Sequence, residues 1–547
     1  MPDFEQYLRG RTLVLLSNRE PYEHVAPKEN APRDGEGAAP QVRRPPGGLV
    51  SALDPTMRHT QGTWVAWGSG SADAQTADKD GRLQVPPEDP SYTLRRVFLD
   101  PADVEGYYFG FANSALWPIC HMLLQHYSFR EEHWERYQAV NRRFADAVAE
   151  ECRRAPHPPV VWTQDYHFAL APAMLRERLT ADGLARRAFL HQFWHIPFPP
   201  PDIFNLLPTD VQGEVLRGML GNDLLEFHTE RHAMNFMDCV AQFVPGAQVR
   251  REHHFVRFAE RTVRVGAFPI SVDAGYYERL AREGAGRAAE LRAEYAGLGR
   301  TLAVSVDRID YTKGIPERLR ALDKLWADAP ELREALTVLL VGTPSRSEIA
   351  SYQALECEVE ELVQAINARW GTDGWTPIVY RHENVDAAEL AAMYRAADLC
   401  LVSSLQDGMN LVAKEFVACQ LDEQGVLVLS RLTGAAEEIY GAVLINPFNV
   451  DGFVQGLREA IAMPAAERRR RMHAMRDQLK RATIFDWLAA ILSRVAELAP
   501  PADAPPPGSA AAVDGALGIR GTGALGAGTG GGSAARGANS LEAGSTV

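Results

Sequence analysis

The sequence predicts an α/β protein with two domains, each built on a mostly parallel sheet. Short apolar runs rich in β-branched and aromatic residues alternate with longer amphipathic segments, which is the pattern of strands joined by helices. This alternation runs to residue 270 and then begins again. A chain of 547 residues is too long for one core, and its 46% apolar residues supply enough apolar surface for two.

The first domain is predicted to span residues 1–270. Its first buried strand is Thr12–Ser17, and a long helix is expected over 134–153. Residues 26–46 are rich in Pro, Gly, Ala and charge, which predicts a mobile loop before Gly47-Gly48. Further strands are expected near Trp64, Val97, Val160 and Phe189.

The second domain is predicted to span residues 271–451. Gly266–Asp273 contains the last strand of the first domain and the crossover into the second. Residues 452–498 are helical, and residues 499–547 form a disordered tail of Pro, Ala, Gly and Ser. Strands of the second domain are expected at 302–306, 337–341, 378–380, 399–403 and 426–430.

Deleting residues 503–547 should leave the activity and the melting temperature of the protein unchanged. The segment has no aromatic residue and buries too little apolar surface to stabilise a fold. Thermal unfolding of the full and the shortened chain, followed by circular dichroism, is the measurement. A fall of several degrees would show that the tail docks instead.

The stretch from Val402 to Glu415 has the pattern of an anion-binding turn. A buried strand ends, the chain turns at Asp407-Gly408, and a helix begins at Asn410. The first N–H groups of a helix lack intrahelical partners and carry partial positive charge, so they bind phosphate. Glu415, one turn into the helix, points back to the same place and suits ribose hydroxyls. An ordinary capped helix has the same pattern, so this motif alone does not define a nucleotide site.

A second stretch, residues 301–316, repeats this arrangement with basic side chains. A β-rich run stops, a polar loop carries Arg308 and Lys313, and Gly314 and Pro316 introduce a helix. Arg offers a planar donor fork and Lys a mobile point charge, so the two cations suit a diphosphate. Ligands of open parallel sheets bind at this carboxyl edge. A single basic loop is more often simply solvated, and it is the pair of motifs that indicates a site.

These motifs, with others in the same order, resemble the trehalose-6-phosphate synthases, a family of retaining nucleotide-sugar glucosyltransferases. Each motif is weak alone, but their order and number cover most of the chain outside the tail. The motifs are Leu16-Ser-Asn-Arg19, Pro46-Gly-Gly-Leu49, Tyr107-Tyr108, Leu116-Trp117-Pro118, Gln164-Asp-Tyr-His167, His195-Ile-Pro-Phe-Pro199, Asp307-Arg-Ile-Asp-Tyr-Thr-Lys-Gly314, Pro344-Ser-Arg346, Asp407-Gly-Met-Asn-Leu-Val-Ala-Lys-Glu415 and Asn446-Pro447.

The resemblance implies a GT-B fold, in which two Rossmann-like domains face each other across a cleft and C-terminal helices return to the first domain. It implies glucose transfer with retention from a nucleotide-glucose to glucose 6-phosphate, giving trehalose 6-phosphate. UDP-glucose is the favoured donor, although the residues leave the base open because base contacts in such sites go largely to backbone. The implied donor-binding residues are Gly47, Gly48, Arg308, Lys313, Asp407, Asn410, Leu411, Val412 and Glu415.

By the same resemblance, one end of the site binds the acceptor. Two guanidinium groups and a phenol suit a phosphate dianion, and an indole offers a sugar an apolar face. Asp165 is expected on sugar hydroxyls. As single residues, the two aromatic side chains suit core packing equally well, and an Arg at a strand end suits a surface ion pair. The implied acceptor-binding residues are Arg19, Tyr108, Trp117, Asp165 and Arg346.

The expected chemistry needs neither a metal ion nor a cofactor. In the family, the departing diphosphate oxygen takes the proton of the acceptor hydroxyl, so the protein mainly positions substrates and stabilises charge. Arg308 and Lys313 are assigned to the leaving diphosphate, and Asp407 to hydroxyls of the transferred glucose. His195, held rigidly by the prolines that follow it, contacts the donor glucose in the family. The catalytic residues so implied are Arg308, Lys313, His195 and Asp165.

The sequence departs from the usual family pattern at several positions. Gln164 replaces a common His, and Asn18–Tyr22 and Trp194 are variants of a divergent bacterial branch. Glucosylglycerol-phosphate synthases, which use glycerol 3-phosphate, share the Arg-Glu-Pro-Tyr start and are the first alternative. They tend to lose Gly47-Gly48 and Arg346, both present here. A non-catalytic sugar-phosphate sensor is a more distant alternative, because silent relatives usually lose donor residues that this chain keeps.

Composition narrows the partners to small molecules. A net charge of −14 argues against a nucleic-acid surface, and no apolar run approaches the ~18 residues of a membrane span. The six cysteines show neither close pairs nor metal-ligand spacing, which favours reduced thiols in the cytoplasm. The oligomeric state stays open, with a homo-oligomer among the expectations.

Overall fold

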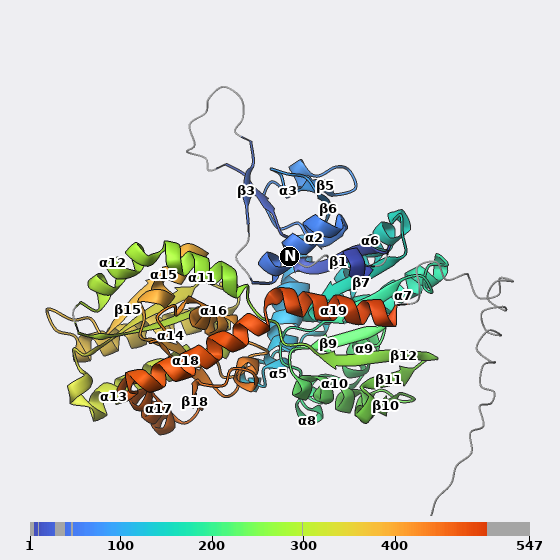
Figure 1. Ribbon diagram of the computed structural model, residues 1–547. Coiled ribbons are helices and arrows are strands. Elements are labelled where there is room, and N and C mark those ends of the chain that lie inside the picture. Colours follow the sequence, from blue (N-terminus) through green and yellow to red (C-terminus); the bar gives the residue numbers. More distant parts are fainter. Residues whose placement is uncertain (1–4, 9, 28–38, 45–47, 298, 500–547) are drawn as a thin grey trace, which may run out of the picture. The chain divides into compact units, whose positions relative to one another are not determined.

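A computed structural model describes residues 5–8, 10–27, 39–44, 48–297 and 299–499 (Figure 1). These residues belong to one compact unit. Their strands form two large, mostly parallel sheets, the first from residues 12–267 and the second from residues 301–445. The predicted α/β fold class is therefore confirmed.

The first sheet has a parallel centre with antiparallel edges. Its parallel strands lie in the order β9-β8-β7-β1-β4-β6, and β12 extends them beside β9. Counted along the chain, this centre has the order 3-2-1-4-5-6 of a Rossmann fold. Short strands β5, β10 and β11 add antiparallel edges. The bounds are β1 Thr12–Arg19, β4 Thr63–Trp67, β5 Arg82–Val85, β6 Tyr92–Val97, β7 Pro159–Gln164, β8 Phe189–Phe193, β9 Leu224–Phe227, β10 Gln248–Arg250, β11 Phe255–Phe258 and β12 Arg261–Ala267.

The second sheet is parallel throughout its described strands. Its order, β15-β14-β13-β16-β17-β18, is again the Rossmann order. Buried Val, Leu and Ile fill the central strands, as expected where helices cover a sheet. The bounds are β13 Thr301–Arg308, β14 Leu336–Thr343, β15 Ile378–His382, β16 Leu399–Val402, β17 Val426–Ser430 and β18 Val443–Ile445.

Helices connect the parallel strands in both halves. In the first half the longer helices are α2 Gly48–Thr60, α6 Glu131–Arg154, α7 Ala171–Ala181, α9 Thr209–Met219 and α10 Glu230–Phe243, and a π-helix, η1, spans Val104–Leu116. In the second half they are α11 Ala274–Glu283, α12 Ala285–Tyr295, α13 Ile315–Asp328, α14 Ala350–Trp370, α15 Ala387–Ala396, α16 Leu411–Cys419 and α17 Val450–Ala462.

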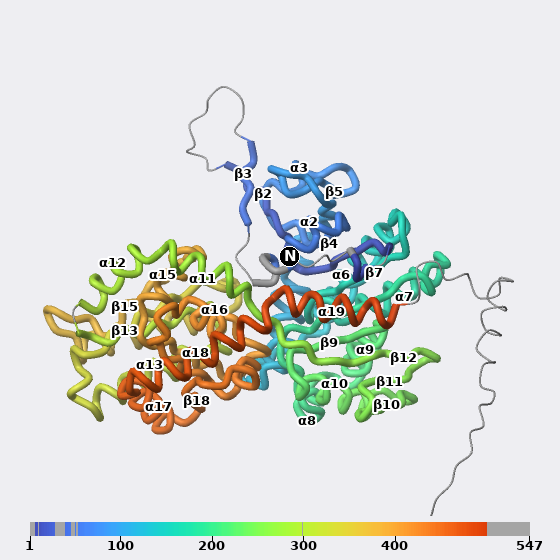
Figure 2. Tube along the Cα trace, viewed as in Figure 1, coloured from blue at the N-terminus to red at the C-terminus, as the bar shows by residue number. Residues whose placement is uncertain are grey.

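The last two helices tie the halves together. Helix α18 (Ala465–Arg481) stays with the second half, where buried Arg476 donates to the carbonyl of Ala418 at the end of α16 (2.7 Å). Helix α19 (Ile484–Leu498) returns to the first half, a course that Figure 2 follows in red. There the Trp487 ring lies 5.1 Å from Phe193 of β8, and its N–H donates to the Phe268 carbonyl (3.0 Å). This is the predicted return to the first domain.

Replacing Thr483 by Ala should lower the free energy of unfolding by about 0.5–2 kcal/mol, the usual contribution of an N-cap. Thr483 and Asp486 form a capping box at the start of α19, with reciprocal side-chain to backbone bonds. Urea unfolding measures the change. Ser493→Ala in the middle of the same helix is the matched control and should cost nothing, because Ala is the better helix former. Equal losses in both variants would contradict the assignment.

The structure differs from the sequence prediction in the segment 26–46. Residues Gln41–Arg43 form a short strand, β3, which pairs antiparallel with β2 (Glu23–Val25), so this part is not a loop. Gly47, most of the predicted loop and all of the tail after Ala499 lie outside the described residues. The domain boundaries at residues 270 and 451 stay predictions. Within the described part of the chain, no helix is both long and apolar enough to cross a membrane.

Candidate active site

The carboxyl ends of four strands carry most of the predicted site residues. In each Rossmann sheet the strand order reverses between two neighbouring strands, β1 and β7 in the first and β13 and β16 in the second. Ligands bind at such reversal points, outside the carboxyl ends of the strands. Arg19 ends β1, Asp165 directly follows β7, Arg308 ends β13, and Asp407 follows β16. Contacts between the two halves bring these ends together.

Arg346 lies at the centre of the residues predicted to bind the acceptor. Its side chain is 6% exposed, and its guanidinium lies 4.0 Å from the centre of the Trp117 ring. It contacts Asp310 Oδ2 (3.2 Å) and the Tyr352 hydroxyl of its own half and donates to the Tyr166 hydroxyl of the other half (3.1 Å). A planar cation stacked on an indole and bonded to a carboxylate is fixed in orientation. Arg346 therefore presents a preorganised fork.

Electrostatics around Tyr108 show that this region is positive. Burial alone would raise the pKa of the Tyr108 phenol, but the charges of Arg346 and Arg19, with a contribution from Arg308, hold it below its usual value. Arg19, Tyr108, Trp117, Arg308 and Arg346 are thus brought into one neighbourhood, as the acceptor assignment requires.

Several buried polar atoms of Arg346 and its surroundings have no hydrogen-bond partner among the described residues. They are Arg346 Nε, Trp117 Nε1 and His167 Nδ1. An unpaired buried donor costs about 1–3 kcal/mol, so such atoms mark places where a ligand or water completes the bonding. The His167 ring stacks on Tyr108 with centroids 5.9 Å apart. The unpaired His167 Nδ1 therefore belongs to a ring that packs on one of the predicted acceptor-binding residues.

Two predicted site residues have strained backbones. Asp165 has φ +70° and ψ 179°, a conformation that is nearly confined to glycine, and Arg346 has φ +51°. Each costs about 1–3 kcal/mol and persists because the surroundings hold it. Burial raises the pKa of Asp165 to about 7, although its Oδ1 accepts the His195 backbone N–H (3.1 Å). Asp165 therefore combines a strained backbone with a carboxyl group whose pKa lies near neutral pH.

On the donor side, Lys313 and Asp407 form an ion pair. Lys313 Nζ lies 2.6 Å from Asp407 Oδ2, and Ser404 and Asn410 donate to the same oxygen. Burial opposes ionisation of Asp407, but Lys313 keeps its pKa below the usual value. Asn410 caps α16, accepting the Ala413 N–H with its Oδ1, and Leu411 and Val412 form the first turn. The helix thus begins at the predicted anion-binding turn.

The remaining donor residues lie close to this turn or outside the described part. Glu415 accepts the Tyr394 hydroxyl (3.1 Å), and burial raises its pKa even though Tyr277 and Tyr394 hydrogen-bond to it. Gly48 begins α2, and Gly47 is not described. Two backbone segments approach each other closely at Gly408. There a Cβ would lie 2.3 Å from the His195 carbonyl oxygen, so only glycine fits.

The His195 ring is held by the protein on both nitrogens. Nε2 lies 2.9 Å from Gln164 Oε1, and Nδ1 lies 3.3 Å from His228 Nε2. Burial lowers the pKa of His195 to about 3, so the imidazole is neutral. The predicted contact of His195 with the donor glucose stays a prediction.

Sequence reasoning missed three residues that organise the site. Asp310 is fully buried between Arg346 and Arg308, and these cations hold its pKa at about 2 against the effect of burial. Tyr352 and Tyr166 complete the shell around Arg346. The position of Asp310 between Arg308 and Lys313 in one loop was a usable signal, because two neighbouring cations need a counter-charge. Nothing in the sequence marked Tyr352.

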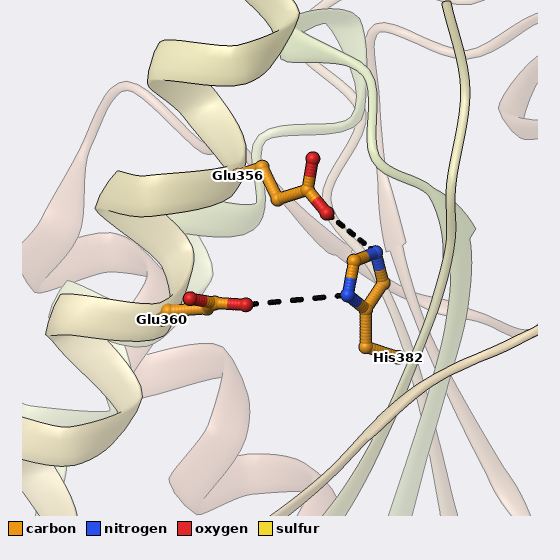
Figure 3. A group of neighbouring side chains, drawn as sticks. All are labelled: Glu356, Glu360 and His382. Carbon is orange, nitrogen blue, oxygen red and sulfur yellow. Dashed lines mark ion pairs between the residues drawn. The ribbon is translucent and has the colours of Figure 1, made fainter. Parts of the chain in front are cut away.

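One group of described side chains has the composition of a metal site: Glu356, Glu360 and His382 (Figure 3). Glu356 lies 2.8 Å from His382 Nε2, whereas Glu360 lies 4.0 Å from Nδ1. The two carboxylates therefore face different ring nitrogens of His382. A metal ion would need both carboxylates and one nitrogen directed at a single point. We describe the group as an ion-pair cluster.

Known proteins are similar to this chain in sequence and in fold. Residues 11–497 match the family model of glycosyltransferase family 20. The trehalose-6-phosphate synthase of Mycobacterium avium is 40% identical over 496 residues, covering 89% of this chain and 96% of the relative. A Burkholderia xenovorans α,α-trehalose-phosphate synthase (UDP-forming) in complex with glucose 6-phosphate aligns with TM-score 0.75 and 30% identity, covering 89% of this chain and 100% of that one. An E. coli structure bound with UDP-2-fluoro glucose aligns with TM-score 0.75 and 30% identity, covering 89% and 99%.

The fold, the gathered strand ends and these comparisons define the protein as a glycosyltransferase. Its two Rossmann-type sheets confirm the expected arrangement of such enzymes. The chain belongs to glycosyltransferase family 20.

Proposed function

We propose that the protein transfers glucose, with retention of configuration, from UDP-glucose to glucose 6-phosphate, giving trehalose 6-phosphate. The supporting observation is the clamp around Arg346, in which Arg346, Arg19 and Tyr108 form a positive, preorganised site beside Asp165. A phosphate dianion fits the guanidinium fork, and the carboxylate suits hydroxyls of the attached sugar. The relatives named above are trehalose-6-phosphate synthases, which supports the same acceptor.

In this proposal the second half holds the donor. Arg308 and Lys313 stabilise the charge that develops on the departing diphosphate, and the N-terminus of α16 supplies backbone N–H donors. Asp407 exchanges its bond with Lys313 for hydroxyls of the transferred glucose once the donor is bound. Glu415 holds the ribose hydroxyls. The six free thiols suit the reducing cytoplasm, where we place the reaction.

A donor and acceptor matrix tests the proposal. Purified protein is incubated with UDP-, GDP- and ADP-glucose, each with glucose 6-phosphate or glycerol 3-phosphate, and the product is analysed for its anomeric linkage. We expect the highest turnover with UDP-glucose and glucose 6-phosphate, and an α,α-linked product. Glycerol 3-phosphate should be a poor acceptor, because its short skeleton does not span from the Arg346 clamp to Asp165 and the donor carbon.

The matrix also separates the alternatives. Faster turnover with glycerol 3-phosphate would make the protein a glucosylglycerol-phosphate synthase. Binding of a sugar phosphate with no transfer from any donor would make it a sensor. Either result would overturn the proposal.

A further inference from the structure

His195 joins the two sides of the proposed site through its backbone. Its N–H donates to Asp165 Oδ1 on the acceptor side (3.1 Å). Its carbonyl oxygen faces the Asp407-Gly408 turn of the donor side so closely that a Cβ on Gly408 would lie 2.3 Å from it. A small shift of the His195 backbone would therefore disturb both neighbours. Whatever fixes the His195 side chain also fixes this junction.

The contacts of the His195 ring define its protonation pattern. Gln164 Oε1, 2.9 Å from Nε2, can only accept, so Nε2 carries the hydrogen. The ring is neutral, so Nδ1 is an acceptor and the hydrogen between the rings belongs to His228 Nε2. His228 is neutral as well, because burial and the nearby His195 and Lys414 hold its pKa well below the usual value. Its Nδ1 must then accept, and the Ile270 N–H donates to it at 3.4 Å.

These three bonds form one directed chain, Ile270 to His228 to His195 to Gln164. The backbone N–H of Ile270 can only donate, so it sets the direction of the chain: with the opposite tautomers it would face a His228 N–H, and His195 Nε2 would face Gln164 Oε1 as a second acceptor. Gln164 Nε2 has no hydrogen-bond partner among the described residues. The chain is anchored on both sides, because Gln164 ends β7 and Ile270 lies in the crossover between the halves. The ring is therefore held in one orientation and one tautomer.

We propose that Gln164 and His228 are positioning residues that lock His195 as the Nε2–H tautomer and so hold its backbone between Asp165 and the Asp407-Gly408 turn. Neither residue touches a substrate in this account. The inference rests on the proposed function for its catalytic consequence, and on the hydrogen-bond chain alone for its tautomer. The proposal gives a role to Gln164, one of the positions at which the sequence departs from the usual family pattern.

Other titratable groups face this chain and belong to any account of its pH dependence. Asp165 approaches from the end of β7, and His191 of β8 lies near His195 and pairs with Glu226 of β9 (2.8 Å). Lys414 of α16 acts on His228, and Trp487 and Phe193 cover the His195 ring with apolar faces. Because the pKa of Asp165 is also about 7, the pH dependence of activity cannot by itself report the protonation of His195.

The test combines ring-¹⁵N spectra of histidine with kinetics of the whole protein. The spectrum of the parent, assigned by comparison with His195→Gln, should show a neutral ring with Nε2 protonated across pH 5–8.

Gln164→Leu removes the acceptor, and we expect kcat to fall between about tenfold and a hundredfold, the scale of a small misplacement in an active site, with little change in either KM. Gln164→His restores an acceptor and should recover most of this loss. Gln164→Glu should let His195 protonate within the same pH range and add an acid-side loss of kcat.

Gln212→Leu is the matched control. Gln212 is an equally buried glutamine that donates to the carbonyls of Asn205 and Leu207, away from His195. It should leave both kcat and the His195 signal unchanged. A parent ring that is cationic or protonated on Nδ1 would overturn the proposal, as would a Gln164→Leu variant with parental kcat or one that Gln164→His does not rescue. Because the spectra need no turnover, a parent without glucose transfer would refute the proposed function and leave the tautomer testable.

Discussion

Replacing Arg308 or Lys313 by Ala should lower the turnover number by about 10²–10³, the usual effect of removing one group that stabilises charge in the transition state. Arg308 ends β13 with a side chain 38% exposed, and Lys313 follows in the same loop. Both lie at the strand reversal of the donor half, where a departing diphosphate would develop its charge. Their loss should leave the fold intact, which circular dichroism checks.

The two variants should differ in one respect. Lys313 is the partner of Asp407, so Lys313→Ala leaves a largely buried carboxylate without its counter-charge, whereas Arg308→Ala leaves Asp310 still paired with Arg346. The double variant Lys313→Ala with Asp407→Asn separates lost catalysis from this secondary effect. Arg300→Ala, which lies just before the opposite end of β13, is the control and should keep parental turnover. Near-normal turnover in both single variants would refute the donor assignment.

Arg346→Ala should raise the KM for glucose 6-phosphate by about ten- to a hundredfold and the donor KM far less, since a charge-assisted bond to phosphate contributes about 1.5–3 kcal/mol. Arg346 is fixed by Asp310, Tyr352, Tyr166 and the Trp117 face, so its fork is aligned before the acceptor binds. Arg346→Lys should recover only part of the loss, because Lys keeps the charge and loses the fork. Initial rates with each substrate varied in turn give both constants.

Removing Arg346 also leaves the neighbouring Asp310 carboxylate with less positive charge around it. Asp310 would lose its nearest counter-charge and keep Arg308 at 3.8 Å and the weaker influence of Lys313, so Arg346→Ala should unfold at lower urea concentration than the parent. Asp310→Asn combined with Arg346→Ala relieves this without restoring the fork, and the acceptor KM should stay high. Arg320→Ala, in an exposed pair with Glu358, is the control. Equal increases in the two KM values would contradict a role confined to the acceptor.

The fold was largely predictable because strands and helices are encoded locally. Each strand expected from an apolar run, from Thr12–Ser17 to Val426–Ser430, lies in or overlaps a strand of the structure, since buried parallel strands need continuous apolar residues. The short antiparallel strands β5, β10 and β11 were not foreseen. Their three or four residues mix polar and apolar side chains, and they become strands only by pairing: β5 with β6, β11 with β12, and β10 with β11.

The positions of the site residues along the chain were also readable from the sequence. Arg19, Asp165, Arg308 and Asp407 follow buried strands, and the carboxyl edge of a parallel sheet is where ligands bind. What such positions cannot tell is which side chains meet. Lys313 and Asp407 are 94 residues apart within the second half, so their contact depends on how that half folds. Arg346 and Tyr166 are 180 residues apart in different halves, so their contact depends on how the two halves pack.

The sequence by itself determined the strand and helix order, the Rossmann-type halves and the family, because hydrophobic periodicity and short motifs are local properties of the chain. Only the tertiary structure decided the charge and proton states of the site. It paired Lys313 with Asp407, placed Asp310 between two arginines and enclosed the His195 ring between Gln164 and His228. The physical reason is that burial and neighbouring charges set a pKa, and both arise from segments that meet only when the chain is folded.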